Sequence, residues 1–212
     1  MVFEQVFYVA VLSLEQPGIH DETSNRPKTR TRSGFTNFEL VDRIPTNTRT
    51  AKGDPRVNET IKFADIEKEF LDRVGRIVWC TVSTVDAKGH PFARILHPVW
   101  EGPTGWIATG RQTLKTKHLA KNPYVALAYW DAQQDTAIVH ARAEWCDDTA
   151  TKSRIWRLLE TTPPPVGYDP KLFWRGGVSD PTFGVLKITP SRIQLRTGAE
   201  MMQGKPARLC RL

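Results

Sequence analysis

Downstream of residue 60, hydrophobic and polar positions alternate in short runs that are separated by turn residues. Runs rich in β-branched and aromatic residues, bounded by Gly, Pro, Asn and Asp, are typical of β-strands. The pattern predicts strands at 76–84, 92–100, 106–109, 124–130, 136–145, 183–189 and 192–197. A turn signal at 86–89 joins the first two strands into an antiparallel hairpin. Pro98 lacks a backbone N–H, so we expect an edge or a bulge near the end of the second strand.

A helical period appears at three places between these strands. In the first, Ile66, Phe70 and Val74 lie four residues apart with charged residues between them, which predicts an amphipathic helix at 63–74 that ends at Gly75. The other predicted segments are helices at 113–121 and 150–159, an extended loop with three consecutive prolines at 161–169, and a short turn at 171–174. Many short strands joined by tight turns, with few helices, are typical of an antiparallel barrel.

The sequence therefore predicts a mainly β domain of the α+β class at 61–212, with six to seven antiparallel strands in a closed or nearly closed barrel and flanking helices. Residues 1–60 differ, because 16–58 is poor in large apolar residues. Such a segment buries too little surface to offset its ordering entropy, so we expect a largely disordered N-terminal extension. Two interpretations stay open: a true extension, or a translation start near Val57. The apolar run 6–14 has neither the flanks of a signal peptide nor the length of a membrane span.

Charge and cysteine content narrow the class of protein. The net charge is +7, and the excess lies in residues 61–212, which hold 22 Lys/Arg and 15 Asp/Glu. A basic domain suits nucleic acid, an acidic membrane surface or an anionic small molecule, but no Lys/Arg run with interleaved aromatic residues favours nucleic acid. Three cysteines without Cys-x-x-Cys spacing argue against a disulfide framework or a metal site and indicate a reducing cytoplasm. Motifs of dinucleotide-fold dehydrogenases, nucleotide hydrolases, zinc proteases and serine hydrolases are absent from the sequence.

The candidate chemistry lies in the stretch 93–130. Arg94 belongs to an apolar strand, where a charged side chain needs a fixed anionic partner. Thr109 ends the next strand, and Thr113 is the expected N-cap of a helix whose first turn carries Lys115. An Arg and a Lys that converge on the N–H groups of a helix start make a phosphate site.

Each of these interpretations has a structural alternative. Arg94 can instead form a salt bridge to Glu101 or Glu144, and Lys115 can be a solvated surface side chain. His97 lies in the strand of Arg94, where a lone histidine is more often packed and hydrogen-bonded than catalytic. The sequence therefore assigns no catalytic residue.

Three segments in this stretch resemble one known family. They are R-I-L-H-P-V at 94–99, A-T-G-R-Q-T-L-K at 108–115 and L-A-K-N-P-Y-V-A-L-A-Y-W at 119–130. In their order and spacing they resemble the FMN-binding split-barrel proteins related to pyridoxamine 5′-phosphate oxidase, and among these the bacterial general-stress-type members. The resemblance covers roughly Ile61 to Thr197 and implies a split β-barrel.

The resemblance also implies a cofactor site and an assembly. It places the phosphate of FMN at Arg94, Lys115 and the helix start, and the ring along 94–97 and 108–109. The residues carried over as cofactor-binding are Arg94, Ile95, Leu96, His97, Ala108, Thr109, Thr113, Lys115 and Thr136. Members of the family are homodimers with the cofactor at the subunit interface, so a homodimer is expected.

Two departures from the family pattern limit what is carried over. The helix start reads Ser-Arg-Lys in the family but Thr-Leu-Lys at 113–115 here, which removes one phosphate contact that Arg111 or Lys117 can replace. Thr136 and Arg196 stand where the oxidase has a Gln and a Trp near the flavin. We therefore do not expect a true pyridoxamine phosphate oxidase.

The sequence thus predicts an FMN-dependent oxidoreductase whose substrate and electron donor are not specified. Three alternatives stay open. One is a reductase that uses the deazaflavin coenzyme F-420, whose acidic tail suits the basic domain. Another is a non-enzymatic flavin- or haem-binding stress protein on the same barrel. The most distant is a basic barrel that binds nucleic acid.

Overall fold

The computed structural model describes residues 60–212, and the predictions made for residues 1–59 lie outside them. The strands are β1 (Thr60–Ile61), β2 (Cys80–Val85), β3 (Pro91–Leu96), β4 (Val99–Glu101), β5 (Thr104–Gly110), β6 (Tyr124–Trp130), β7 (Thr136–Trp145), β8 (Phe183–Arg196) and β9 (Arg208–Arg211). The α-helices are α2 (Phe63–Ile77), α3 (Leu114–Lys121), α4 (Thr149–Thr161) and α5 (Gly198–Met202), and the 3-10 helices are η1 (Pro170–Leu172) and η2 (Gly177–Ser179).

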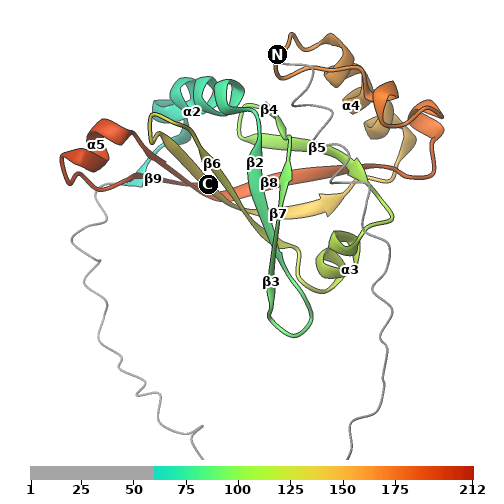
Figure 1. Cartoon of the computed structure of the whole chain (residues 1–212), viewed down its shortest axis with the longest axis horizontal. Coiled ribbons are helices and arrows are strands. Elements are labelled where there is room, and N and C mark those ends of the chain that lie inside the picture. Colours follow the sequence, from blue (N-terminus) through green and yellow to red (C-terminus); the bar gives the residue numbers. More distant parts are fainter. Residues whose placement is uncertain (1–59) are drawn as a thin grey trace, which may run out of the picture. The chain divides into compact units, whose positions relative to one another are not determined.

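The sheet closes on itself because one strand bends (Figure 1). β2 pairs antiparallel with β3 and β6, β6 with β7, β7 with β8, and β8 with β5. β5 pairs in turn with β4, which follows β3 directly after His97 and Pro98. When β3 and β4 are counted as one bent strand, six strands form the ring. This confirms the predicted antiparallel split barrel, and the break at Pro98 is the predicted irregularity.

Two hydrophobic cores lie on opposite faces of β5 and β8. Ile107 points into the barrel, where it joins Phe70 of α2. Its neighbour Trp106 points to the other face and packs with Val185 of β8 and Trp156 of α4. Figure 1 shows α2 and α4 above the sheet and α3 beside the β2–β3 hairpin. Because side chains alternate between the two faces of a strand, β5 and β8 contribute residues both to the barrel core and to the outer core.

The bounds of several elements differ from the prediction. α2 continues through Gly75 to Ile77, so β2 begins at Cys80 rather than at residue 76. The strands predicted at 183–189 and 192–197 are one strand, β8. Pro190 is tolerated within it because the register against β7 shifts at this point, which leaves an irregularity where an N–H donor is not required. α5 and β9 were not predicted; β9 pairs with β8 and, in parallel, with β1.

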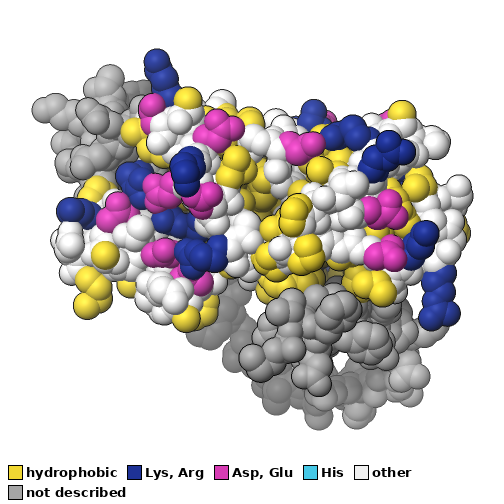
Figure 2. Space-filling view, turned by 90° about the horizontal axis from the view of Figure 1, so that it is seen from above, with side chains coloured by type: hydrophobic (Ala, Val, Ile, Leu, Met, Phe, Trp, Pro, Cys, Tyr) yellow, Lys and Arg dark blue, Asp and Glu magenta, His cyan; other side chains and the backbone are white. Residues whose placement is uncertain are grey.

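The face that carries α2 and α4 is largely charged around a more hydrophobic middle (Figure 2). A cavity of about 340 Å³ lies between α2, β4 and the prolines that follow α4, with Leu71, Trp100, Leu158 and Pro164 in its lining. Within residues 60–212, no helix is long and apolar enough to cross a membrane. The three cysteines are free thiols.

Candidate functional site

The register of the β2–β3 hairpin sets the position of the candidate anion site. Thr84 lies opposite Phe92, and Val82 lies opposite Arg94. Thr84 and Val82 are buried on the same side of β2, because residues two apart on a strand share a face. α3 packs against β2, so side chains from β2, β3 and the buried face of α3 meet here.

Arg94 is half-buried in this region. Its Nη1 donates to the carbonyl oxygen of Val82 at 3.3 Å, and burial lowers the pKa of the guanidinium. The two carboxylates considered as alternatives bind elsewhere, since Glu101 pairs with Arg154 and Glu144 with Arg142. No carboxylate of residues 61–212 forms an ion pair with Arg94.

Lys115 is more deeply buried than Arg94, with 7% of its surface exposed. Its Nζ donates to the Thr113 hydroxyl at 2.7 Å. Burial, and then the positive charge of Arg94, lowers the pKa of Lys115 to about 8. Within the described part of the chain, Lys115 also has no carboxylate partner.

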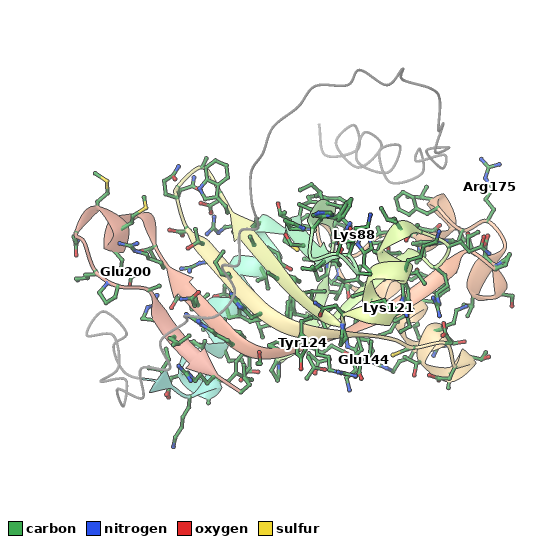
Figure 3. The ribbon with its side chains drawn as sticks, turned by 90° about the horizontal axis from the view of Figure 1, so that it is seen from below. Lys88, Lys121, Tyr124, Glu144, Arg175 and Glu200 are labelled. Carbon is green, nitrogen blue, oxygen red and sulfur yellow. The ribbon has the colours of Figure 1, made fainter. Side chains whose placement is uncertain are left out.

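Two desolvated cations that repel each other are unfavourable unless an anion is bound between them. The guanidinium of Arg94 is suited to bidentate contact with a phosphate, and the ammonium of Lys115 adds a compact charge. Lys88 in the β2–β3 turn and Lys121 at the end of α3, both labelled in Figure 3, are exposed and add positive charge to the two elements that carry Arg94 and Lys115. The side chains present therefore fit a phosphate group.

The start of α3 contributes backbone donors to the same point. Thr113 is the N-cap, as predicted, but its hydroxyl forms no capping bond. It donates instead to the carbonyl of Gly110 at 3.0 Å and accepts from Lys115. Of the first-turn N–H groups, that of Thr116 donates to the Thr113 carbonyl at 3.0 Å. Those of Leu114 and Lys115 have no acceptor among the described residues and are available to an anion.

The third polar member of this cluster, His118, was missed in the sequence. It is 4% exposed and lies one turn after Lys115 on the same face of α3. Its Nδ1 lies 2.9 Å from the Thr84 hydroxyl oxygen, and its ring packs on Phe92 with 4.7 Å between centroids. Burial and then the charge of Arg94 lower the pKa of His118, while Asp86 opposes this effect. The i, i+3 spacing from Lys115 was the available signal.

The two residues suggested as replacements for the family's missing Arg are differently placed. Arg111 is held by Asp147 through two bonds, at 2.9 and 3.0 Å, and stacks over Trp145. Lys117 is exposed on α3, as is Leu114, which occupies the position of the missing Arg. Arg111 is therefore committed to another partner.

The remaining residues that the family resemblance assigns to cofactor binding lie in different environments. Thr109 is buried on the inner face of β5 and precedes the Gly110 that Thr113 contacts. Ala108 faces the outer core on the opposite side of the strand. Leu96 lies in the barrel core, whereas Ile95 is 43% exposed on β3. Of these side chains, Thr109 is adjacent to the anion site along the chain.

His97 and Thr136 are not brought together with Arg94 and Lys115. The ring of His97 packs between Trp79 and Tyr168, and burial lowers its pKa to about 4. The Thr136 hydroxyl donates to the carbonyl of Arg196 at 3.3 Å, at the end of β7 remote from α3. Within one chain, neither side chain extends the anion site.

Comparison with known proteins agrees with this fold. A sequence model described as pyridoxamine 5′-phosphate oxidase matches residues 66–197. The chain belongs to the pyridoxamine 5′-phosphate oxidase family. The matched residues include every strand of the ring, and with them Arg94, Lys115 and His118. No curated protein matches the chain.

Solved structures show the same fold at low sequence identity. A Clostridium acetobutylicum protein related to general stress protein 26 of B. subtilis has a TM-score of 0.58 and 17% identity, over 72% of this chain and 97% of the other. General stress protein 26 of Bacillus anthracis has a TM-score of 0.50 and 19% identity, over 68% and 99%. A conserved hypothetical protein of Mycobacterium tuberculosis has a TM-score of 0.53 and 17% identity, over 71% and 92%.

Proposed function

We propose that the protein is an FMN-dependent oxidoreductase in which Arg94, Lys115 and the start of α3 hold the cofactor phosphate. The observation that carries the proposal is the pair of desolvated, mutually repelling cations without a carboxylate partner in the described residues. Such a pair reduces the stability of the folded chain, and a residue pair that does so is typical of a binding site. Membership of the family supports a flavin as the ligand.

In this proposal, the strand and the helix each provide residues that bind the phosphate. Arg94 would contact the phosphate from the strand side, and Lys115 and the free N–H groups of α3 would contact it from the helix side. The ring would lie along β3 and the end of β5, near Ile95 and Thr109, as the family resemblance implies. FMN supplies the redox chemistry when it is bound, and the protein supplies position and positive charge.

We further propose that a second copy of the chain completes the site. β3 pairs with β2 alone, so its outer edge is open within the described chain. Phe92 and Ile95 on this strand are 37% and 43% exposed. An open edge with exposed apolar residues is suited to contact with another chain. A homodimer would cover this edge and provide the side of the ring pocket that one chain lacks.

A deazaflavin coenzyme is the second candidate, and one observation favours it. Residues 61–212 carry the whole net positive charge of the protein, and Lys88 of the β2–β3 turn and Lys117 and Lys121 of α3 are exposed. A coenzyme with a long acidic tail beyond its phosphate would contact these side chains. FMN, which ends at its phosphate, makes no use of them.

The absorbance spectrum of the natively expressed protein, followed by mass spectrometry of the released ligand, tests the proposal. We expect a flavin spectrum, or binding of added FMN, and a released mass equal to that of FMN. A deazaflavin mass would favour the second candidate. A protein that carries and takes up neither compound contradicts both.

Turnover distinguishes an enzyme from a carrier. With a nicotinamide reductant and an artificial acceptor, we expect repeated reduction and reoxidation of the bound cofactor at a rate above that of free FMN. Bound FMN that is never reduced would support the non-enzymatic alternative. We expect no oxidation of pyridoxamine phosphate, because the residues of the true oxidase are replaced at Thr136 and Arg196.

A further inference from the structure

A buried pair, Thr84 and His118, borders the anion site and has no part in the proposal above. Thr84 belongs to β2 and is 1% exposed, and His118 belongs to α3. Their side chains meet at 2.9 Å, between Oγ1 and Nδ1. Nε2, on the opposite side of the ring, makes no hydrogen bond within residues 61–212 and is not among the fully buried atoms that lack a partner.

The surroundings of His118 keep the ring neutral near pH 7. Burial is the main cause of its lowered pKa, and the charge of Arg94 on β3 adds to it. Asp86, in the turn after β2, acts in the opposite direction. Lys115 is the other charged group on the same face of α3. A neutral imidazole has one N–H donor and one acceptor nitrogen, so its tautomer decides which side can donate.

Thr84 selects the tautomer. If Nδ1 carried the proton, the Thr84 hydroxyl would accept from it, and the buried hydroxyl proton would have no acceptor among residues 61–212. If the hydroxyl donates to Nδ1, both groups are satisfied, and an unsatisfied buried donor is avoided. The proton of the ring then lies on Nε2, which is the nitrogen without a partner among the described residues.

We infer that His118 is a third donor to the bound phosphate, through its Nε2–H. Thr84 is the positioning residue that fixes this tautomer. The inference rests on the proposed function, because the anion concerned is the phosphate of the proposed cofactor. His118 thus provides the contact that the family's Arg makes and that Leu114 cannot make here. It does so without a third positive charge beside Arg94 and Lys115.

Binding of FMN and of riboflavin, which lacks the phosphate, tests this role. His118→Leu removes the donor, and we expect FMN to bind about 10-fold more weakly or worse, as for a lost hydrogen bond to a charged group. Riboflavin affinity should stay unchanged. Thr84→Val keeps the shape of Thr84 and should weaken FMN by a smaller factor. Equal affinity of His118→Leu and the wild type for FMN would overturn the inference, and so would equal losses for FMN and riboflavin.

Nuclear magnetic resonance of the histidine nitrogens gives a second readout that needs no cofactor. In the wild type we expect the Nε2–H tautomer of His118 near pH 7, and a shift of its signal when inorganic phosphate is added. Thr84→Val should give a mixture of tautomers. A proton on Nδ1, or a signal that phosphate leaves unmoved, would overturn the inference.

The controls separate this inference from the proposed function. His140→Leu changes an exposed histidine on β7 and should alter neither binding nor the His118 signal. If His118→Leu fails to fold, His118→Gln, which keeps an N–H donor, is used in its place and should retain FMN binding. The FMN affinity of Thr84→Val and the shift of the His118 signal on addition of phosphate then decide whether the inference holds. A wild type that binds no flavin but shows the phosphate shift would refute the cofactor and retain His118 as a phosphate donor.

Discussion

At the scale of single residues, the ammonium of Lys115 makes anion binding depend on pH. Its pKa is about 8 in the empty protein, because of burial and then the charge of Arg94. Below pH 8 the charge is present. Above it, binding of a phosphate must recapture a proton, so the dissociation constant of FMN should rise by roughly tenfold per pH unit. Fluorescence titration of FMN between pH 7 and pH 9.5 measures this.

Lys115→Arg is the matched variant for this prediction. A guanidinium stays charged throughout the range, so the affinity of this variant for FMN should remain nearly constant between pH 7 and pH 9.5. Parallel curves for the wild type and Lys115→Arg would show that another group is responsible for the pH dependence.

The same residue should oppose stability in the absence of ligand. Replacing a buried, unpaired ammonium by an apolar chain of similar length removes a desolvation cost. We expect Lys115→Met to raise the free energy of unfolding of the empty protein by about 1 kcal/mol while weakening FMN binding. Urea denaturation without cofactor checks this. A variant that is less stable than the wild type would indicate that Lys115 is structural.

At the scale of elements, Glu69 links α2 to the end of the sheet. Its carboxylate accepts from Arg73 at 2.7 Å and from Arg208 at 2.6 Å, and the bond from Arg208 is the main cause of its lowered pKa. Arg73 is 4% exposed and also donates to the carbonyl of Thr136. Loss of this carboxylate leaves a buried guanidinium without its counter-ion.

Glu69→Gln should therefore lower the free energy of unfolding by about 1 to 2 kcal/mol, less than for a fully buried pair because Glu69 is partly exposed. A carboxylate with a lowered folded pKa stabilises above its unfolded pKa, near 4.5, and this contribution disappears in acid. The difference in the free energy of unfolding between Glu69→Gln and the wild type should therefore shrink as the pH falls through the lowered pKa of Glu69, below 4.5. Asp72→Asn, in an exposed pair on the same helix, is the control and should change stability little.

Elements with strong local signals were predictable from the sequence. β6 and β7 have the predicted bounds because turn residues stand at both ends. The sequence prediction divided β8 into two strands at Pro190. Pro190 is tolerated within the strand because the register against β7 shifts there, and such a shift cannot be predicted from the local sequence. β9 was missed because a short strand is stabilised only by its pairing with β8 and β1.

The residues of the candidate site, too, were predictable where their signal in the sequence is local. Arg94 and Lys115 were found because a charge in an apolar strand and a Lys at a helix start are local features. His118 was missed because its partner, Thr84, is 34 residues away. His97 was predicted to lie in the same strand as Arg94, but the chain bends at Pro98 and the ring of His97 packs on Trp79 instead.

At the scale of the whole molecule, the open edge of β3 predicts a dimer with about twice the mass of one chain in solution. Ile95→Glu places a charge on this edge and should give monomers that bind FMN weakly, because the second half of the site is lost. Analytical ultracentrifugation and FMN titration measure both effects. Leu172→Glu, on exposed η1, is the control and should remain dimeric. A monomeric Ile95→Glu that binds FMN as the wild type does would place the cofactor within one chain.

The central claim is that Arg94 and Lys115 recognise a cofactor phosphate, and the ratio of the dissociation constants of riboflavin and FMN tests it most directly. Two charge-assisted contacts predict a ratio of about 100 or more in the wild type at pH 7. Arg94→Ala should reduce that ratio at least tenfold by weakening FMN alone, with Arg94→Lys in between. A ratio near one in the wild type, unchanged in Arg94→Ala, would contradict the account.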